Sequence, residues 1–256
     1  MRFDVITLFP ELFGPFLAHG VTRRAYASGQ VQVRLWNPRD YAEGNYRRVD
    51  DRPFGGGPGM VMMAPPLERC MDAIRAERAQ EPGADPSGAR VPLVLFSPIG
   101  SALNHTAVEH WAASEGAVLL CGRYEGIDQR FIDAHVDVQI SLGDFVLSGG
   151  EIAALALLDA VTRLQPGVLN DEGSHQLDSF NPALDGLLDC PHYTRPEEWA
   201  GRGVPPALLS GHHAQIERWR RDQRLRLTAQ HRPDLIESAR AAGRLQPADE
   251  AVLKPL

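Results

Sequence analysis

Three short segments combine glycine with polar residues directly after apolar runs, and their composition suits ligand binding. The segments are SPIGS (97–101), CGRYEGID (121–128) and SLGDFVLSGGE (141–151). Glycine lets the backbone approach a ligand closely and present its N–H and C=O groups directly. A flat, neutral heterocycle such as adenine needs such backbone hydrogen bonds at its edge and apolar contact on its faces. One such loop is ordinary turn chemistry, but three together favour a ligand site.

The usual phosphate-binding motifs are absent from the sequence. No GxxxxGK[ST] segment occurs, which argues against a Walker phosphate loop. The segment GGGPGM (55–60) contains Pro58 and follows no clear strand, so it is a poor dinucleotide fingerprint. The three glycine loops therefore indicate adenine held by backbone groups more than a triphosphate held by lysine.

The apolar pattern predicts which elements position these loops. Strands are expected at 3–9, 31–36, 91–96, 117–121 and 136–140, and helices at 106–114, 129–135 and 151–164. Strands that alternate with helices favour an α/β fold with a parallel, doubly covered sheet. In such a sheet the loops after the strands share one edge, and ligands bind there. The three glycine loops are therefore expected to meet at that edge.

The remaining segments divide the chain into parts. A long loop is expected at 39–66 and a helix at 67–80, with a turn-rich exit at 81–88. After Pro166 the composition becomes polar and turn-rich, and then helical segments follow at 214–230 and 233–242. We therefore expect domains at 1–166 and 183–256, the second small and mainly helical, with a flexible linker at 167–182.

Composition sets the broad class of protein. The 256 residues are 43% hydrophobic and 23% charged, as in globular proteins, and the net charge is −7. The three cysteines are widely spaced without a CxxC pair, so reduced thiols are expected rather than disulfides, and no metal site is predicted. The N-terminus does not fit a signal peptide and the longest aliphatic run, 152–158, is short, so a soluble, cytoplasmic protein is expected.

Arginine is concentrated in two zones. Residues 212–244 hold eight arginines and four acids, and residues 21–52 hold seven arginines and four acids. Such runs are often solvated helix faces, yet two of them in a protein of net negative charge favour a phosphate-bearing partner.

Longer motifs resemble one known family. In chain order these are LFPE, VDDRPFGGGPGM, FSPIG, CGRYEGID, GDFVLSGGE, PGVL, DSF, LLDCPHYTRP and LLSGHHAQI, and together they span about residues 1–240. They resemble the bacterial tRNA (guanine-N(1))-methyltransferases of the TrmD type, which belong to the SPOUT methyltransferases. The resemblance implies an α/β domain with a deep trefoil knot, a rare exception to unknotted topology. The apolar periodicity itself shows no knot.

The resemblance also implies a reaction and its partners. The family transfers a methyl group from S-adenosyl-L-methionine to N1 of the tRNA guanosine immediately 3′ of the anticodon, position thirty-seven, where another guanosine precedes it. Its members are homodimers with active sites at the subunit interface, and magnesium assists them, although no spacing here predicts its site. Domain 1–166 would bind the cofactor and domain 183–256 the tRNA.

Carried onto this sequence, the resemblance assigns residues to three roles. The cofactor contacts are Leu95, Pro98, Gly100, Gly122, Tyr124, Glu125, Ser141, Leu142, Gly143, Asp144, Phe145, Val146, Leu147, Gly149 and Gly150. The substrate contacts are Gly57, Gly59, His192, Tyr193 and Arg195, and the catalytic residues are Asp178 and Arg163.

The chemistry explains why an acid and a cation are needed. Guanine N1 carries a proton at neutral pH, so the site requires a base near N1 and a positive charge near O6. Asp178 is the base and Arg163 the cation that the resemblance implies. An exposed aspartate has a pKa of roughly 3.9, too acidic for an efficient base, but a linker that orders over the substrate could desolvate Asp178. From the residues alone, Asp178 is a turn acid and Arg163 a helix C-terminal charge.

One departure from the family pattern and two alternatives remain open. The family commonly has an acid before the DSF aspartate, whereas this chain has Leu177. Glu125 is either a second acid near the amino group of the methyl donor or a salt-bridge partner of Arg123 or Arg130. A non-catalytic RNA-binding or cofactor-sensing module on the same fold is the main alternative function. A Rossmann-type methyltransferase is disfavoured because LFPELFG (8–14) lacks its glycine-rich loop.

Overall fold

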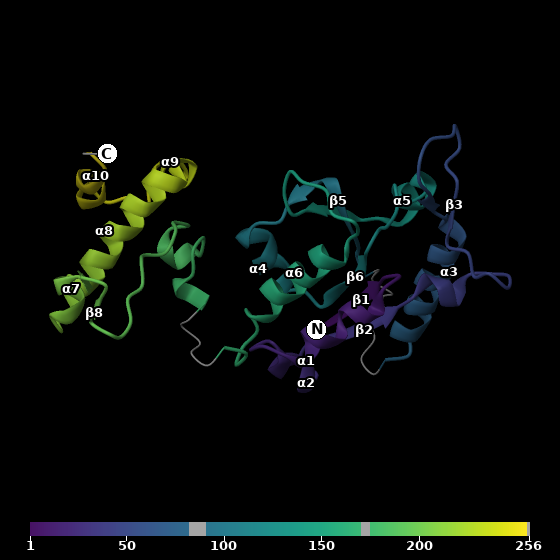
Figure 1. The fold of residues 1–256 in the computed structure, drawn as a ribbon, viewed down its shortest axis with the longest axis horizontal. Coiled ribbons are helices and arrows are strands. Elements are labelled where there is room, and N and C mark those ends of the chain that lie inside the picture. The colour runs from purple at the N-terminus through teal and green to yellow at the C-terminus, as the bar shows by residue number, and fades with distance from the viewer. Residues whose placement is uncertain (82–90, 170–174, 255–256) are drawn as a thin grey trace. The chain divides into compact units, whose positions relative to one another are not determined.

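The structure is a computed structural model that describes residues 1–81, 91–169 and 175–254. The chain divides into two compact units, Met1–Leu169 and Asn170–Leu256. The first is an α/β unit built around a parallel sheet, and the second is mainly helical (Figure 1).

The sheet of the first unit has five parallel strands in the order β2-β1-β6-β5-β7. The strands are β1 (Arg2–Ile6), β2 (Gln32–Trp36), β5 (Leu93–Ala102), β6 (Gly116–Leu120) and β7 (Val138–Ser141). In the register Phe3 lies opposite Val33 on one side and Ala117 on the other. The parallel sheet expected from the sequence is therefore confirmed.

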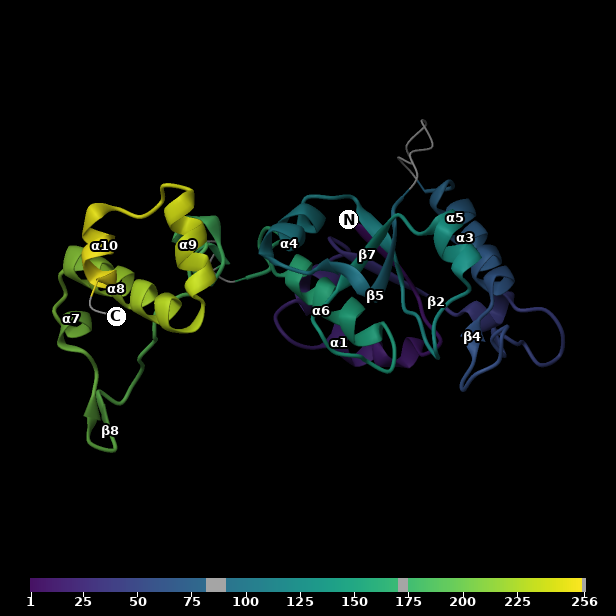
Figure 2. The same ribbon diagram turned by 90° about the horizontal axis from the view of Figure 1, so that it is seen from above.

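Helices cover both faces of this sheet (Figure 2). One face packs against α1 (Gly14–Ala18), α2 (Arg23–Ala27), α4 (His105–Ala112) and α6 (Glu151–Thr162), and the other against α3 (Ala64–Arg78) and α5 (Gln129–His135). Side chains alternate between the faces, so Phe3 and Val5 enter the first cluster and Ile6 the second. Each fully buried Phe or Ile contributes roughly 1.5–3 kcal/mol, so this double core gives a rigid frame.

Three segments of the first unit differ from the expected elements. Strand β5 continues to Ala102 instead of ending at Phe96, with a bulge in which Phe96 and Ser101 both lie opposite Ile140. The expected long loop contains a 3₁₀ turn (Pro38–Tyr41) and a hairpin of β3 (Asp50–Asp51) and β4 (Val61–Met62). Helix α3 begins at Ala64, before the expected start, because its prolines stand in the first turn, where proline needs no N–H partner.

The second unit is small and contains three longer helices. They are α8 (His213–His231), α9 (Pro233–Ala241) and α10 (Pro247–Leu253), preceded by the short helix α7 (Pro206–Leu209) and a hairpin of β8 (Glu198–Trp199) and β9 (Arg202–Gly203). Its buried apolar cluster is made of Leu187, Leu225, Ile236 and Ala239. The sequence did not predict α10, which starts with a proline and a capping box between Gln246 and Asp249.

Part of the expected linker, 167–182, has defined structure. A 3₁₀ turn covers His175–Leu177, and the amide of Phe180 donates to the carbonyl of Leu187 at 2.9 Å. Residues 175–182 thus belong to the second unit, while 170–174 lie outside the described residues. In the part of the chain that the structure describes, no helix is long and apolar enough to cross a membrane.

Candidate functional site

Residues 95–98 of β5 and the loops after β6 and β7 surround a cavity of about 270 Å³ at the carboxyl edge of the sheet. Most of the predicted cofactor residues line it: Leu95, Pro98, Gly122, Tyr124, Glu125, Ser141, Leu142, Gly143, Phe145, Val146, Leu147, Gly149 and Gly150. Gly100 and Asp144 do not line it. Three segments separated by tens of residues thus meet at one small site, as the sheet topology predicts.

Gly100 has a different environment from its predicted neighbours. A side chain at this position would come within 2.5 Å of the backbone of Gln139 and Ile140. The close approach of the β5 bulge to β7 therefore requires glycine at this position.

The third loop folds back on itself immediately after β7. The amide of Gly143 donates to Oγ of Ser141 at 3.1 Å, and the amide of Phe145 donates to the carbonyl of Gly143 at 2.9 Å. Gly143 has φ of +151°, a conformation that L side chains rarely adopt. The turn leaves Phe145 and Val146 exposed beside the cavity. This backbone is therefore shaped to present groups to a ligand.

Backbone contacts join the second and third loops. The amide of Gly150 donates to the carbonyl of Gly122 at 3.0 Å. A side chain at Gly150 would lie 2.8 Å from Cα of Cys121, so only glycine allows this approach. Gly150, which directly precedes α6, thus allows the third loop to pack closely against the second.

A buried ion pair strengthens the same junction. Nε of Arg123 donates to Oε1 of Glu151 at 3.1 Å, and Nη2 of Arg123 lies 2.9 Å from Oε2 in an ion-pair contact without hydrogen-bond geometry. Sequence reasoning assigned no role to Glu151 and treated Arg123 only as a partner for Glu125. The available signal was the single arginine of these two loops, Arg123, among four acidic residues.

The glycine-rich segment 55–60 lies against the second loop. The amide of Glu125 donates to the carbonyl of Met60 at 3.0 Å, and the amide of Met62 donates to the carbonyl of Gly126 at 2.9 Å. A side chain at Gly59 would collide with the carboxylate of Glu125. The predicted substrate residue Gly59 and the predicted cofactor residue Glu125 are therefore in direct contact.

The two salt bridges considered for Glu125 are not formed. Arg123 pairs with Glu151, and Arg130 pairs with Asp128 at 2.6 Å. Glu125 lines the cavity.

Tyr124 connects the cavity to the segment before β4. Nη2 of Arg39 donates to the Tyr124 hydroxyl at 3.4 Å, and Tyr124 has φ of +61°. Burial, followed by a hydrogen bond with Asp50, raises the pKa of Tyr124, so the phenol stays protonated at neutral pH. Such a positive φ is uncommon in a non-glycine residue, and Tyr124 is one of the residues that line the cavity.

The two predicted catalytic residues lie in different units. Arg163 is the C-cap of α6 in the first unit, and its amide donates to the carbonyl of Asp159 at 3.0 Å. Asp178 is half-buried in the second unit, where its carbonyl accepts from the amide of Asn181 at 3.2 Å. Within its unit, Asp178 is held in a turn of fixed geometry.

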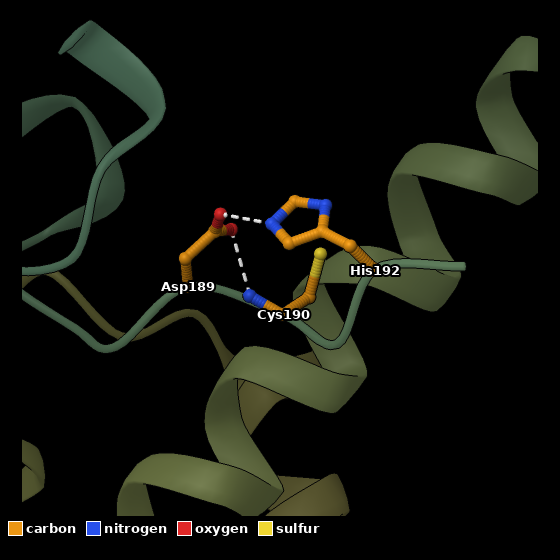
Figure 3. A group of neighbouring side chains, drawn as sticks. All are labelled: Asp189, Cys190 and His192. Carbon is orange, nitrogen blue, oxygen red and sulfur yellow. Dashed lines mark hydrogen bonds and ion pairs between the residues drawn. The ribbon is translucent and has the colours of Figure 1, made fainter. Parts of the chain in front are cut away.

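Gly57 lies in the first unit, whereas His192, Tyr193 and Arg195 lie in the second, where His192 contacts the carboxylate of Asp189 (Figure 3). This carboxylate accepts from the amide of Cys190 at 2.7 Å and lies 2.8 Å from Nε2 of His192. Burial would raise the pKa of Asp189, but hydrogen bonds from the Cys190 amide, His192 and Arg224 outweigh it and lower this pKa. The ring of Tyr193 packs edge-on against Trp219.

This cluster also has the donor atoms of a metal site. One ligand atom each from Asp189, Cys190 and His192 lies within 4.8 Å of the others. However, Nε of Arg224 donates to the same carboxylate at 3.3 Å, and a guanidinium beside it opposes a bound cation. Burial, followed by the charge of Asp189, also raises the pKa of the Cys190 thiol, which disfavours the thiolate that a metal requires. The arrangement therefore fixes the DCPHY segment on α8.

Many arginines of the two arginine-rich zones form ion pairs within their own unit. In the second zone the pairs are Arg218–Asp222, Arg218–Asp249, Arg220–Glu217, Arg221–Asp185, Arg221–Asp249, Arg224–Asp189, Arg232–Asp234 and Arg240–Glu250. In the first zone Arg34 pairs with Glu77 and Glu81, and Arg47 with Asp40. Much of the positive charge counted from the sequence is thus already compensated.

The fold and the cavity define a class of protein. A doubly covered parallel sheet with glycine loops around a cavity at its carboxyl edge is the arrangement of α/β proteins that bind a small ligand there.

Comparison with known proteins identifies the family within this class. A family profile described as tRNA (Guanine-1)-methyltransferase TrmD matches residues 1–238. Curated relatives named tRNA (guanine-N(1)-)-methyltransferase match the whole chain. The chain is 78% identical to the relative from Paracidovorax citrulli and 58% identical to the relative from Bordetella parapertussis. In both cases the match covers 98% of the relative's length. The chain therefore belongs to the tRNA (guanine-1)-methyltransferase family, TrmD, and is a methyltransferase.

Proposed function

We propose that this enzyme transfers a methyl group from S-adenosyl-L-methionine to N1 of the tRNA guanosine immediately 3′ of the anticodon, position thirty-seven. A guanosine at the preceding position is preferred. The observation that carries the proposal is the meeting of the family's three glycine loops around one cavity in a chain that matches the family over residues 1–238.

The cavity suits the cofactor in its chemistry. Residues 141–143 and 145–147 line the cavity and can offer backbone groups to the edge of adenine, and Leu95 and Leu147 offer apolar contact to its faces. The carboxylate of Glu125 suits the amino group of the methionine moiety. When bound, S-adenosylmethionine supplies a methyl group that its sulfonium charge already activates, so methyl transfer itself requires no metal.

Two side chains act on the guanine: one accepts the proton of N1, and the other stabilises the charge on O6. Asp178 accepts the proton from guanine N1 while the bond from N1 to the methyl carbon forms and the bond from that carbon to sulfur breaks. Arg163 stabilises the negative charge that develops on O6. The products are N1-methylguanosine and S-adenosylhomocysteine, and the proton stays on the Asp178 carboxylate until solvent removes it.

The assembly around this chemistry is also part of the proposal. The first unit contains the trefoil knot of the SPOUT methyltransferases and binds the cofactor, and the second unit binds tRNA. The enzyme is a homodimer in which both subunits complete each site. Magnesium dependence and a cytoplasmic location stay predictions, which EDTA treatment and cell fractionation test.

Reverse transcription tests the proposed reaction, because a methyl group on N1 of guanine blocks Watson–Crick pairing. A tRNA transcript incubated with enzyme and cofactor should give a stop at the modified guanosine. A matched transcript with adenosine at that position should be read through. Cofactor binding without any stop would contradict the proposal and support the non-catalytic module instead.

A further inference from the structure

The ion pair between Arg123 and Glu151 connects the exit of β1 with the loops that follow β6 and β7. Glu151 is the first residue of α6, and its Oε1 accepts from the Thr7 hydroxyl at 2.9 Å as well as from Arg123. The Thr7 hydroxyl in turn accepts from the amide of Phe9 at 3.0 Å. One carboxylate therefore links the exit of β1, the second cofactor loop and the third.

Arg123 makes the complementary set of contacts. Its Nη1 donates to the carbonyl of Ser148 at 3.2 Å, and its guanidinium carbon lies 4.4 Å above the centre of the Phe9 ring. Its own amide donates to Sδ of Met62 at 3.3 Å. The Arg123 guanidinium thus holds the last turn of the third loop in place, and the Arg123 backbone contacts Met62 of β4.

Gly149 shows how closely the third loop depends on this pair. A side chain there would come within 2.5 Å of Cδ of Arg123 and of Oε2 of Glu151. Gly149 and Arg123 both line the cavity, whereas Glu151 lies behind it. The third loop therefore packs directly on the ion pair, and the ion pair sets the distance between the second and third loops.

We propose that Arg123 and Glu151 are positioning residues that fix the second and third loops at the spacing which S-adenosylmethionine requires. The inference rests on the proposed function only in the identity of the cofactor. Neither residue reacts, and their effect is expressed in cofactor affinity, because preorganised loops do not have to be ordered on binding.

A second buried pair at the opposite edge of the same sheet provides a matched control. Nε of Arg78 donates to Oδ2 of Asp4 at 2.6 Å, and their side chains are 17% and 0% exposed, against 19% and 1% for Arg123 and Glu151. Lysine keeps the charge in both places but loses the planar fork, and at position 123 it also loses the stacking on Phe9. In Arg78→Lys the Asp4 carboxylate keeps its ion pair with Arg2, and cofactor binding should be unchanged, whereas in Arg123→Lys it should be weakened.

The experiment measures binding of S-adenosylmethionine to the full chain by calorimetry, together with steady-state kinetics on tRNA. We expect Arg123→Lys and Glu151→Gln to raise the cofactor Kd and KM on the order of tenfold, with the KM for tRNA unchanged. Arg78→Lys should leave both within about twofold of the wild type. A Kd for Arg123→Lys within twofold of the wild type, or an equal rise in Arg78→Lys, would overturn the proposal.

Two further variants keep the test informative if the single charged variants fold poorly. The double variant Arg123→Met with Glu151→Leu replaces the pair by apolar side chains, which restores stability in comparable cases. If the pair positions the loops, the double variant should recover stability but still bind the cofactor weakly. If the pair only stabilises the fold, the double variant should recover both stability and cofactor affinity. Thr7→Val, which removes one hydrogen bond to Glu151, should raise the cofactor Kd about twofold to threefold.

The outcome separates the inference from the proposed function. Wild-type enzyme that binds the cofactor but leaves tRNA unmodified would contradict the proposed function alone. Wild-type enzyme that modifies tRNA, with Arg123 variants of unchanged cofactor affinity, would contradict the positioning role alone.

Discussion

The two units of this chain are stabilised by different forces. In the first, apolar clusters on both faces of the parallel sheet include Phe3, Leu119 and Leu157, all fully buried. In the second, the buried apolar cluster is small, and α8 is tied to its surroundings by arginine–carboxylate contacts such as Arg221 with Asp185 and Asp249. The first unit is therefore suited to hold a preorganised cavity, while the stability of the second depends on the charge of its carboxylates.

This difference also changes how the arginine-rich sequence is interpreted. Arg221 and Arg224 lie among carboxylates of their own unit, so their charge stabilises the fold. The arginines outside such pairs are the ones whose charge is not already balanced by a carboxylate and is available to RNA phosphate groups. The number of basic residues therefore overstates the surface available for RNA.

The largest expected effect separates the chemical roles of the two units. Asp178→Asn should lower turnover on the order of 10²–10⁴-fold, because asparagine cannot accept the N1 proton. Cofactor affinity should stay unchanged, since the cavity residues belong to the first unit. Single-turnover methyl transfer and calorimetry on the same preparation measure both quantities. Full turnover in this variant would remove Asp178 from the role of base.

The next effect concerns stability. Asp249 has a side chain only 2% exposed, which accepts from Arg221 at 2.9 Å. Asp249→Asn should lower the free energy of unfolding by about 2–3 kcal/mol, because a hydrogen bond to a charged group is lost. Asp234→Asn, in an exposed pair with Arg232, is the matched control and should leave stability near that of the wild type. Equal denaturant midpoints for the two variants would contradict the comparison.

Acid should destabilise the second unit before the first. The pKa values of Asp189 and Asp249 are lowered in the fold: burial opposes the shift, but hydrogen bonds to each carboxylate outweigh it. The unfolded chain therefore binds more protons below about pH 4, and stability is lost as pH falls through the folded pKa values. The indole N–H signals of Trp199 and Trp219 in proton NMR spectra should change at a higher pH than those of Trp36 and Trp111 in the first unit. Coincident transitions would argue against separate stabilising forces.

The smallest effect concerns RNA binding. Arg226 is exposed on α8, and no ion pair to it is found among the described residues, whereas Arg232 pairs with Asp234. Arg226→Ala should weaken tRNA binding a few-fold and reduce the salt dependence by about one ion, while Arg232→Ala changes both less. Filter binding at several salt concentrations measures this. The reverse order of effects would show that internal pairing does not decide which arginines bind RNA.

The sequence predicted the parts of the fold that depend on local pattern. The α5 helix begins and ends where the apolar spacing places it, and the glycine loops meet at the carboxyl edge because parallel strands bring them there. By contrast, the extension of β5 depends on pairing between Ser101 and Ile140 in β7, which no local pattern shows. Helix α10 is short and begins with proline, so its apolar period is too weak to predict.

The same limit applies to the candidate site. Leu95 and the residues of the third loop follow from motifs, whereas the pairing of Arg123 with Glu151 depends on the approach of two loops in space. Local spacing cannot distinguish this partner from Asp128 or Glu125. Gly100 shows the converse, since its need for glycine comes from the β7 backbone and not from the cavity.

The most direct test of the central claim is to map the product on tRNA by mass spectrometry of nuclease fragments, using transcripts that differ only at the target guanosine or at the nucleotide before it. The account predicts one methyl group per tRNA on N1 of the guanosine 3′ of the anticodon, less of it when the preceding guanosine is replaced, and none when the target is adenosine. Methylation at another nucleotide or ring position, or no methylation by an enzyme that binds S-adenosylmethionine, would contradict it.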